Sequence, residues 1–305
     1  MSASEVKALH LLSTQLETSF DSDLGVFWAF MSPNPRPCFN LHLLDDLAEF
    51  INTIKSSYSS ARRNGSQVRY GVLASKTSGV FNLGGDLGLF RTLIQLQDRN
   101  SLLDYGRRCV DNLLSWHRNC DAPMTSIALV QGDALGGGFE AALSATVLIA
   151  EESSRMGFPE ILFNLFPGMG AFSFLSRKIG RRAAEEMITS GTIYSARQLY
   201  DMGVIDVLTP DGTGEAAVHG FIRKHSRNMS GRQAFEKAKN VVSPVTEEEL
   251  LRVVEIWADT ALRLQDRDLK VMERLIRAQV RSTQNLDEQQ MSGANVVPMH
   301  ALTAI

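Results

Sequence analysis

Short apolar runs and longer periodic segments alternate along the first two thirds of the chain. Some short segments are apolar at almost every position and are bounded by Gly, Pro or polar residues, which is typical of buried strands: 23–31, 68–75, 126–132 and 146–150. Other segments repeat apolar residues every three or four positions, which predicts helices: 41–58, from 86 onward, and 101–119. Asp86 is the expected N-cap of the second helix. Strands that alternate with helices predict an α/β architecture.

The pattern changes after Pro244. Residues 246–282 lack a strand signal and predict two helices with a break near 265–268, the first capped by Thr246. We therefore expect an α/β core that carries the active site over 1–200, a helical region over 201–285 and a loosely ordered tail over 286–305. The helical region has an apolar face, which is expected to cover the cleft and to meet other subunits.

Composition narrows the classes of function. The chain has 305 residues, of which 44% are hydrophobic and 21% charged, and its net charge of -3 gives no reason to expect nucleic-acid or membrane-surface binding. No apolar run approaches the roughly 20 residues of a membrane-spanning helix, and the N-terminus lacks the pattern of a secretory signal. The three cysteines have unrelated spacings, which is typical of reduced thiols. We expect a cytoplasmic protein without membrane insertion.

Three consecutive glycines, residues 136–138, stand between a predicted strand and a predicted helix. Glycine loses more backbone entropy on folding than other residues, so this triplet carries a cost. The usual gain is that a ligand approaches bare backbone N–H groups at the N-terminus of a helix. Two kinds of ligand fit this description: the pyrophosphate of a dinucleotide, or a carbonyl oxygen that becomes anionic during a reaction.

The dinucleotide alternative is the weaker of the two. Residues 136–141 satisfy the pattern G-x-G-x-x-G/A, and the acid Glu151 follows the next strand. This acid comes too early, however, because the dinucleotide fingerprint places it about 20 residues downstream. Glu140 would also bring a carboxylate beside the pyrophosphate. A dinucleotide-binding oxidoreductase therefore remains the least favoured of the hypotheses.

The oxyanion alternative has a second loop and two acids in its favour. Residues 81–87, FNLGGDL, form another glycine loop between a strand and a helix, so two backbone N–H groups can point at one oxygen. Glu140 lies one turn inside the helix that the triplet opens, and Glu160 is flanked by apolar residues. In a dry pocket, burial and a neighbouring carboxylate raise carboxyl pKa values. One glutamate can then act as a base and the other as an acid, and the two titrate as a coupled unit.

Metal and nucleophile motifs are absent from the sequence. It has no HExxH, no paired CxxC, no P-loop lysine and no G-x-S-x-G elbow. His117 and Cys120 share a helix end, but such a pair without further ligands is more often structural. We expect no metal or organic cofactor.

The segments FNLGGDL, ALGGGFE and GFPEI, followed by LFPGMGAFSFL and SARQLYDMGVIDVL, resemble the enoyl-CoA hydratase/isomerase (crotonase) superfamily over roughly residues 20–280. The resemblance implies a spiral of stacked β-β-α turns with a helical C-terminal region, assembled as trimers or dimers of trimers. It maps the oxyanion-hole donors to the N–H groups of Gly85 and Gly137 and the two catalytic glutamates to Glu140 and Glu160. It also suggests that Glu160 faces the α-carbon while Glu140 handles water or the leaving hydroxyl.

More narrowly, FNLGGDL, YGRRCV, IALVQGDALGGGFEAALS, FPEILFNLFPGMGA and EIWADTA are similar to the branch that makes diffusible signal factor. That branch implies dehydration of a 3-hydroxyacyl thioester on acyl carrier protein to the cis-2-enoyl form, followed by thioester hydrolysis to the free acid. It also implies docking on a sensor kinase. A conventional enoyl-CoA hydratase that acts on CoA thioesters stays open as the alternative.

An acyl chain needs an apolar pocket, for which the sequence offers six candidates: Leu135, Phe158, Met169, Trp257, Met272 and Leu275. Lys76 and Arg91 flank the first glycine loop and are candidates to bind CoA or the phosphopantetheine of a carrier protein. Arg62, Arg63 and Arg69 are candidates to meet an acidic carrier. The length and branching of the acyl chain depend on the depth of the pocket, which the sequence does not define.

Overall fold

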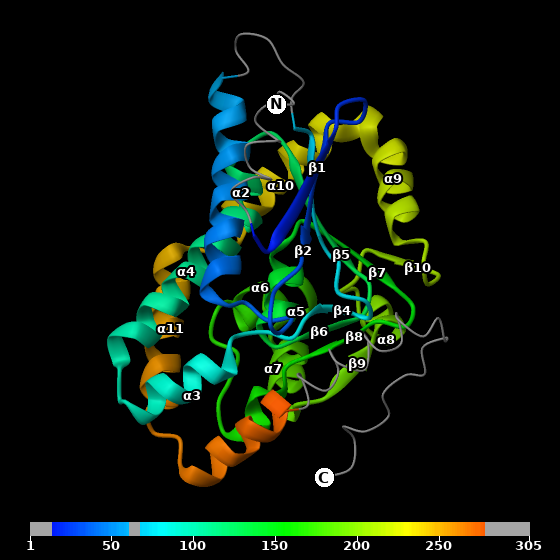
Figure 1. Ribbon diagram of the computed structural model, residues 1–305. Coiled ribbons are helices and arrows are strands. Elements are labelled where there is room, and N and C mark those ends of the chain that lie inside the picture. The colour runs from blue at the N-terminus through cyan, green and yellow to red at the C-terminus, as the bar shows by residue number, and fades with distance from the viewer. Residues whose placement is uncertain (1–13, 61–67, 278–305) are drawn as a thin grey trace, which may run out of the picture.

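The computed structural model describes residues 14–60 and 68–277 (Figure 1). Arg62, Arg63 and the predicted tail over 286–305 lie outside these residues. The described chain has a mixed α/β fold with a helical C-terminal region, as the sequence predicts.

The main sheet has six strands in the order β1-β2-β3-β5-β7-β10. Their bounds are β1 Leu16–Asp21, β2 Val26–Met31, β3 Tyr70–Ser75, β5 Thr125–Val130, β7 Val147–Glu151 and β10 Val207–Thr209. β1 and β2 form an antiparallel hairpin, and the other neighbours pair in parallel. The four strands predicted from apolar runs are confirmed, with ends shifted by up to three residues. β1 escaped prediction because it is an edge strand whose alternate side chains are exposed.

A second sheet contains four strands of three residues each, in the order β4-β6-β8-β9. They are β4 Val80–Asn82, β6 Asp133–Leu135, β8 Arg155–Gly157 and β9 Ile193–Ser195. Along the chain, β3, β5 and β7 of the main sheet are followed by β4, β6 and β8 of the small sheet, and each pair leads into helices. This repeat is the expected spiral of β-β-α turns. The small strands are too short for their periodicity to be visible in the sequence.

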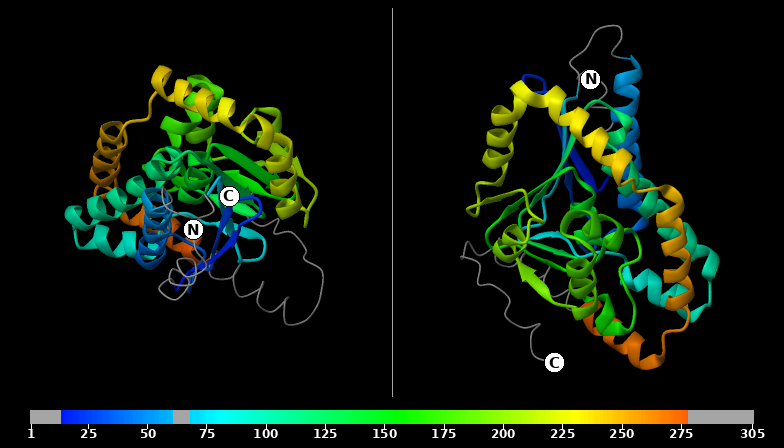
Figure 2. Two further views of the ribbon diagram at one scale, coloured as in Figure 1. Left: turned by 90° about the horizontal axis from the view of Figure 1, so that it is seen from above. Right: turned by 180° about the vertical axis from the view of Figure 1, so that it is seen from behind.

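Helices cover both faces of the main sheet. They are α2 Leu41–Ser60, α3 Leu87–Gln95, α4 Arg99–His117, α5 Gly137–Ser144, α6 Ala171–Ile179, α7 Arg181–Ser190, α8 Ala196–Asp201, α9 Gly214–His225, α10 Met229–Val242, α11 Glu247–Ala261 and a further helix over 266–277. The short 3-10 helices are η1 Asn119–Asp121, η2 Pro159–Phe163 and η3 Ser226–Asn228. The larger apolar core lies on the side of α2, α4 and α11, and a smaller core lies under α9 (Figures 1 and 2).

Two details of the predicted organisation change. β10 joins the main sheet beside β7, and α9 packs on that sheet through Val218 and Ile222. The α/β core therefore extends past residue 200, because a parallel sheet needs apolar cover on both faces and α9 provides the second. In the C-terminal region the first helix begins as predicted, with the Thr246 hydroxyl accepting the Glu249 N–H. The break falls at 262–265, slightly before the predicted position.

All three cysteines are unpaired and buried. Within residues 14–60 and 68–277, none of the helices has the length and apolar character needed to cross a bilayer.

Gly106 allows α11 to pack closely on α4, since a Cβ added there would lie 2.4 Å from Cγ1 of Val254. We expect Gly106→Ala to lower the free energy of unfolding by about 1–3 kcal/mol, because the added methyl overpacks this contact. Gly220→Ala in α9 is the matched control: its Cβ would meet no atom, so the variant should gain up to about 1 kcal/mol of helix stability. Urea denaturation of both variants checks this, and equal stability of the two would contradict the proposed packing constraint.

Candidate active site

Both glycine loops and both predicted glutamates line one cavity of about 520 Å³. The topology explains why. β4, β6 and β8 are parallel neighbours in the small sheet, so their carboxyl ends meet at the same edge. The first glycine loop follows β4, the glycine triplet follows β6, and Glu160 in η2 follows β8. Segments far apart in the sequence therefore converge at one edge, where ligands bind in many α/β folds.

The two glycine loops touch backbone to backbone. A Cβ added to Gly84 would lie 3.0 Å from the nitrogen of Gly137, and one added to Gly137 would lie 3.4 Å from the nitrogen of Gly85. Among the hydrogen bonds of the described residues, none is donated by the N–H of Gly85 or of Gly137. Both residues line the cavity. This arrangement leaves two neighbouring donors free for one ligand oxygen, the geometry that an oxyanion hole requires.

The other two glycines of the triplet also permit close contacts. A Cβ on Gly138 would lie 2.0 Å from the carbonyl oxygen of Asn82, and one on Gly136 would lie 2.3 Å from Oε1 of Glu160. Gly136 in addition has a φ of 52°, in the left-handed region that favours glycine. The triplet therefore brings the start of α5 against β4 on one side and against the Glu160 carboxyl on the other.

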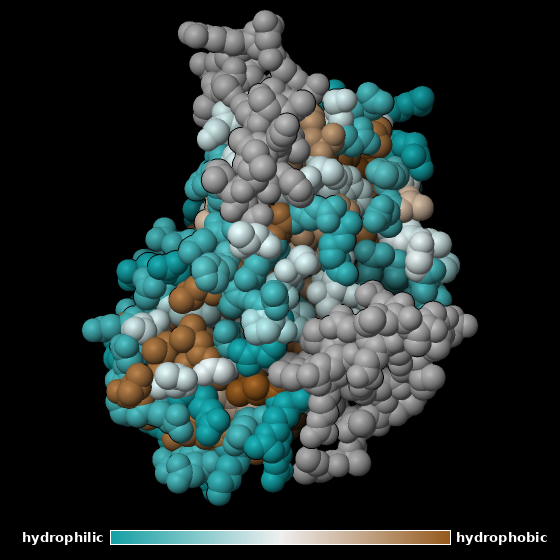
Figure 3. Space-filling view, in the orientation of Figure 1, coloured by the Kyte–Doolittle hydropathy of each residue, from teal (hydrophilic) through white to brown (hydrophobic). Residues whose placement is uncertain are grey.

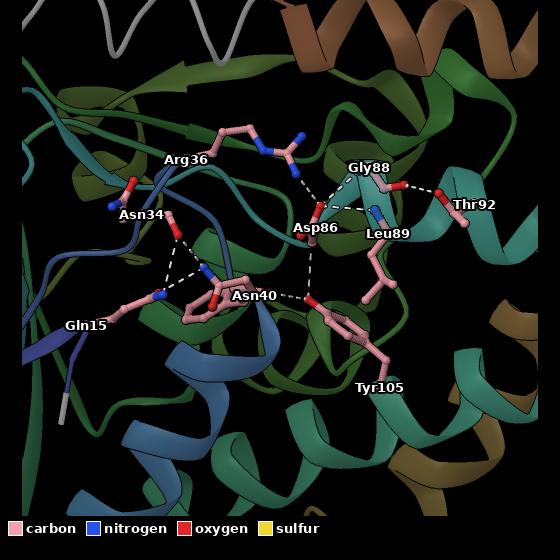
Figure 4. Close-up of polar contacts among 10 residues, drawn as sticks. Gln15, Asn34, Arg36, Asn40, Asp86, Gly88, Leu89, Thr92 and Tyr105 are labelled. Carbon is pink, nitrogen blue, oxygen red and sulfur yellow. Dashed lines mark hydrogen bonds and ion pairs between the residues drawn. The ribbon is translucent and has the colours of Figure 1, made fainter. Parts of the chain in front are cut away.

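A network of polar contacts holds the first glycine loop (Figure 4). Asp86 caps α3 by accepting the N–H groups of Gly88 and Leu89 at 3.0 and 3.1 Å, and its carboxylate pairs with Arg36. The fully buried Tyr105 hydroxyl donates to the carbonyl of Phe39 at 2.6 Å and lies 3.4 Å from the Asp86 nitrogen. Side chains on both sides thus fix the peptide groups that follow Gly85.

The residues just before α2 contact this loop and are themselves held by hydrogen bonds. Phe39 donates its N–H to the Gly84 carbonyl at 2.8 Å. Next to it, Asn40 caps α2 by accepting the N–H of Leu43. The side-chain amide of Asn40 donates to Gln15 at 2.8 Å (Figure 4). The position of the loop is therefore set by the residues just before β1 and just before α2, together with Tyr105 of α4.

Glu140 is buried in the first turn of α5, with 1% of its surface exposed. Its Oε1 accepts the N–H groups of Met169 and Ala171, each at 2.9 Å. Burial raises the pKa of Glu140 to about 7, although the backbone hydrogen bonds favour the charged form and act in the opposite direction. The side chain is held in one orientation and titrates near neutral pH.

Glu160 lies in η2, and within the described part of the chain its inaccessible Oε2 has no hydrogen-bond partner. Burial, followed by the charge of Glu140, raises the pKa of Glu160 to about 8. The residue as a whole is partly buried. Two carboxyls that repel each other in one cavity retain a proton between them at neutral pH, which supplies an acid and a base in the same cavity.

Four of the six predicted pocket residues line the cavity: Leu135, Met169, Trp257 and Leu275. The other two do not. Phe158 is fully buried and stacks on Phe139 with ring centroids 5.0 Å apart, and Met272 turns into the core from the helix over 266–277. Their apolar character reflects core packing, which sequence cannot distinguish from a pocket wall.

Much of the remaining wall comes from residues that the sequence analysis did not single out. They lie on α2 and α4 and include Leu47, Phe50, Ile51, Cys109, Leu113 and Trp116. The apolar stripes of both helices were visible in the sequence, but a stripe indicates only that a face is buried. The cavity also reaches toward the surface at Leu87 and Leu275, both partly buried, and apolar side chains gather there between α3 and the C-terminal helices (Figure 3).

Of the basic residues considered for carrier binding, Lys76 and Arg69 are exposed and Arg91 is partly buried. Lys76 pairs with Glu17 at 3.3 Å, and Arg91 pairs with Glu273 at 3.8 Å. These contacts do not select between CoA and a carrier protein.

Glu151, the acid that the dinucleotide alternative needs, has a structural role. It is buried, and its Oε1 accepts the N–H of Gly214 at 2.9 Å and the side-chain amide of Gln131 at 2.8 Å. The carboxylate thus joins β7 to the start of α9 instead of facing the glycine triplet, which argues against a dinucleotide site.

His117 is partly buried beside Phe174, and desolvation of its imidazole lowers its pKa to about 4. Neither it nor Cys120 belongs to a cluster of three or more metal-type ligands in the residues that the structure describes.

Comparisons with known proteins point to one family. The family model for enoyl-CoA hydratase/isomerase matches residues 29–273. An enoyl-CoA isomerase/hydratase of Mycosarcoma maydis is 29% identical over 264 residues, which cover 83% of this chain and 90% of that protein. A probable enoyl-CoA hydratase of Bacillus subtilis is 30% identical over 131 residues, but these cover only 43% of this chain and 48% of the relative. The solved enoyl-CoA hydratase of Bacillus halodurans superimposes with a TM-score of 0.70 at 18% identity, covering 86% of this chain and 100% of that one.

The buried acids predict an unusual pH dependence of stability. The pKa of Glu160 is raised in the folded state, to about 8. The carboxyl therefore contributes most to the free energy of unfolding at low pH, and this contribution is lost as the pH rises through about 8. Glu160→Gln removes this titration, so its stability relative to wild type should increase by at least about 1 kcal/mol between about pH 5.5 and about pH 9. Urea denaturation at both pH values measures this. Exchange of the exposed Glu248 for Gln should give no such increase, and a constant difference for Glu160→Gln would show that the acid is solvated.

Proposed function

The chain belongs to the enoyl-CoA hydratase/isomerase family, and on that premise we propose that it synthesises a cis-2-unsaturated fatty acid of the diffusible signal factor type. In this proposal it dehydrates a 3-hydroxyacyl thioester on acyl carrier protein and then hydrolyses the thioester. The observation that carries the proposal is that the buried Glu140 and the partly buried Glu160 face the same cavity as two unengaged backbone N–H groups.

Dehydration needs a base, an acid and a site for negative charge. One glutamate, as carboxylate, removes the α-proton, and the electrons move onto the thioester oxygen. The N–H groups of Gly85 and Gly137 stabilise that oxygen, as they would in an oxyanion hole. The other glutamate, as carboxylic acid, protonates the 3-hydroxyl, which leaves as water while the double bond forms. A pair that holds one proton supplies both functions.

Hydrolysis uses the same groups. A glutamate carboxylate takes a proton from water as the water oxygen attacks the thioester carbon. The resulting tetrahedral oxyanion occupies the position between Gly85 and Gly137, and its collapse releases the carrier thiol, which takes up a proton, and the free acid. Neither step requires a metal or an organic cofactor.

A conventional enoyl-CoA hydratase is the second candidate, and the names of the similar proteins fit it equally well. Two features favour the signal-acid proposal: the motifs shared with the signal-synthase branch, and a cavity whose apolar wall continues along α2 and α4, away from the glutamates. The remaining parts of the proposal rest on the resemblance: assembly as trimers or dimers of trimers, contact with a sensor kinase and a cytoplasmic location. Trp257 and Leu275 in the cavity wall support the expectation that the C-terminal helices cover the cleft.

We expect expression of the chain in a host without such signals to produce free cis-2-enoic acids, detected by mass spectrometry of the culture extract. Glu140→Gln and Glu160→Gln each preserve shape but remove the proton chemistry, so each should lower the product at least about 100-fold. Glu248→Gln should leave the yield unchanged. Soluble wild-type protein without a new acid would refute the proposal. Faster turnover of crotonyl-CoA than of a long 3-hydroxyacyl carrier substrate would favour the conventional hydratase.

The coupled acids also predict the pH profile of the dehydration step. The value of kcat/KM should be highest between the two pKa values, about 7 and about 8. It should fall below this range because the base becomes protonated, and above it because the acid loses its proton. Hydrolysis of a preformed enoyl thioester needs only the carboxylate, so its rate should keep rising with pH to a plateau. A flat dehydration profile from about pH 5.5 to about pH 9 would exclude a shared proton.

A further inference from the structure

Part of the cavity wall follows one face of α4, and we call the space beside it the apolar branch. Tyr105, Cys109, Leu113 and Trp116 all line it, and their spacings of four, four and three residues place them on the same side of the helix. Tyr105 stands at the first glycine loop, because its hydroxyl would lie 3.4 Å from a Cβ on Gly85. From Tyr105 to Trp116 the helix rises by about 16 Å. This is close to the length of an extended dodecanoyl chain.

The walls of this branch offer little to a polar ligand. Leu47, Phe50 and Ile51 of α2 face it, and Ala141 and Ser144 of α5 complete the wall near Glu140. The Ser144 hydroxyl donates to the Ala141 carbonyl at 2.7 Å, and the Asn112 side-chain amide donates to the Leu44 carbonyl at 3.0 Å. A branch with such walls favours a hydrocarbon, since a polar group would lose its hydrogen bonds to water there.

Aromatic rings close the far end. Trp116 is 5% exposed and packs against Phe50, with ring centroids 5.9 Å apart, and Phe50 packs against Phe27 at 4.6 Å. Behind the indole lies Gly71 of β3, where an added Cβ would come within 2.7 Å of Cη2 of Trp116. The indole is therefore wedged between the sheet and α2 and cannot move deeper. Within the described residues its N–H has no acceptor, so packing alone holds the ring.

We propose that this branch holds the hydrocarbon tail of the acyl substrate and that Trp116, backed by Phe50, determines the longest chain that the enzyme accepts. The inference rests on the proposed function for the reacting thioester and adds the residue that limits the length of the acyl chain, because the tail ends against the indole ring. Trp116 acts on specificity and takes no part in the proton chemistry.

The test compares Trp116→Ala with Trp28→Ala in the full-length protein. Trp28 is a matched control because it is also 5% exposed, yet it packs in the smaller core on the other face of the main sheet, where it stacks on Phe30. The substrates are the 3-hydroxyoctanoyl, 3-hydroxydodecanoyl and 3-hydroxyhexadecanoyl thioesters of acyl carrier protein, called octanoyl, dodecanoyl and hexadecanoyl below. Removing the indole lengthens the branch, so Trp116→Ala should raise kcat/KM for hexadecanoyl relative to dodecanoyl by about tenfold or more. Trp28→Ala should leave that ratio unchanged.

A blocking variant tests the same branch from the other direction. Leu113→Trp places a large side chain between Glu140 and Trp116, so it should reduce kcat/KM for dodecanoyl at least about tenfold relative to octanoyl. Should the alanine variants not fold, Trp116→Leu and Trp28→Leu form the replacement pair with the same expected ratio.

Calorimetric binding of dodecanoic and hexadecanoic acids separates this inference from the proposed function, because it requires no turnover. Suppose that Trp116→Ala binds hexadecanoic acid more tightly relative to dodecanoic acid than wild type does, while no variant consumes thioester. This result would support the tail-binding role of the branch and refute the proposed reaction. Formation of cis-2-enoic acid with an unchanged length preference in Trp116→Ala, in both turnover and binding, would overturn the inference. The same shift in Trp28→Ala would also overturn it, because the effect would then be a general loss of packing.

Discussion

The contact between the backbones of the two glycine loops is the constraint on which the rest of the site depends. Gly84 and Gly137 approach so closely that a Cβ on Gly84 would lie 3.0 Å from the Gly137 nitrogen and 2.9 Å from the Leu135 carbonyl oxygen, and would push the loops apart. Only at this separation can the N–H groups of Gly85 and Gly137 reach one oxygen. The carbonyl of Asn82 against Gly138, the Tyr105 bridge and the Asp86 cap all hold the same two segments in place. The glycine triplet costs backbone entropy on folding, and this cost allows a preorganised pair of N–H donors to form.

The same close packing places two carboxyl groups in a cavity where their charged forms are poorly solvated. Glu140 is anchored by the backbone of the segment before α6, while one oxygen of Glu160 has no partner in the described part of the chain. Burial of unpaired carboxyls destabilises the folded state, and here it moves both pKa values toward neutrality. The destabilising environment is what allows the carboxyls to exchange protons near neutral pH. Stability and reactivity are therefore opposed at this pair of side chains.

The pair of helices α2 and α4 contributes both to the core and to the cavity. Where their apolar faces meet the sheet they form the larger core, and where they stand apart they leave an apolar branch that ends at Trp116. Gly71 removes the side chain that would otherwise displace the indole, and Gly106 removes the one that would displace α11 from α4. Small residues in these positions set the distances between elements, and those distances set the shape of the cavity.

The sequence by itself determined four of the six strands of the main sheet, the helix starts at Asp86 and Thr246, the two glycine loops and the two candidate acids. Each of these features depends on a few residues that are neighbours in the sequence, because helix caps, hydrophobic periodicity and the lack of a glycine side chain are local properties. Only the tertiary structure decided that Glu160 lies against Gly136, that Phe158 and Met272 enter the core, that the main sheet takes a strand from beyond residue 200, and that the faces of α2 and α4 leave a cavity. An apolar position predicts burial, whereas what it is buried against depends on how parallel strands and distant helices come together.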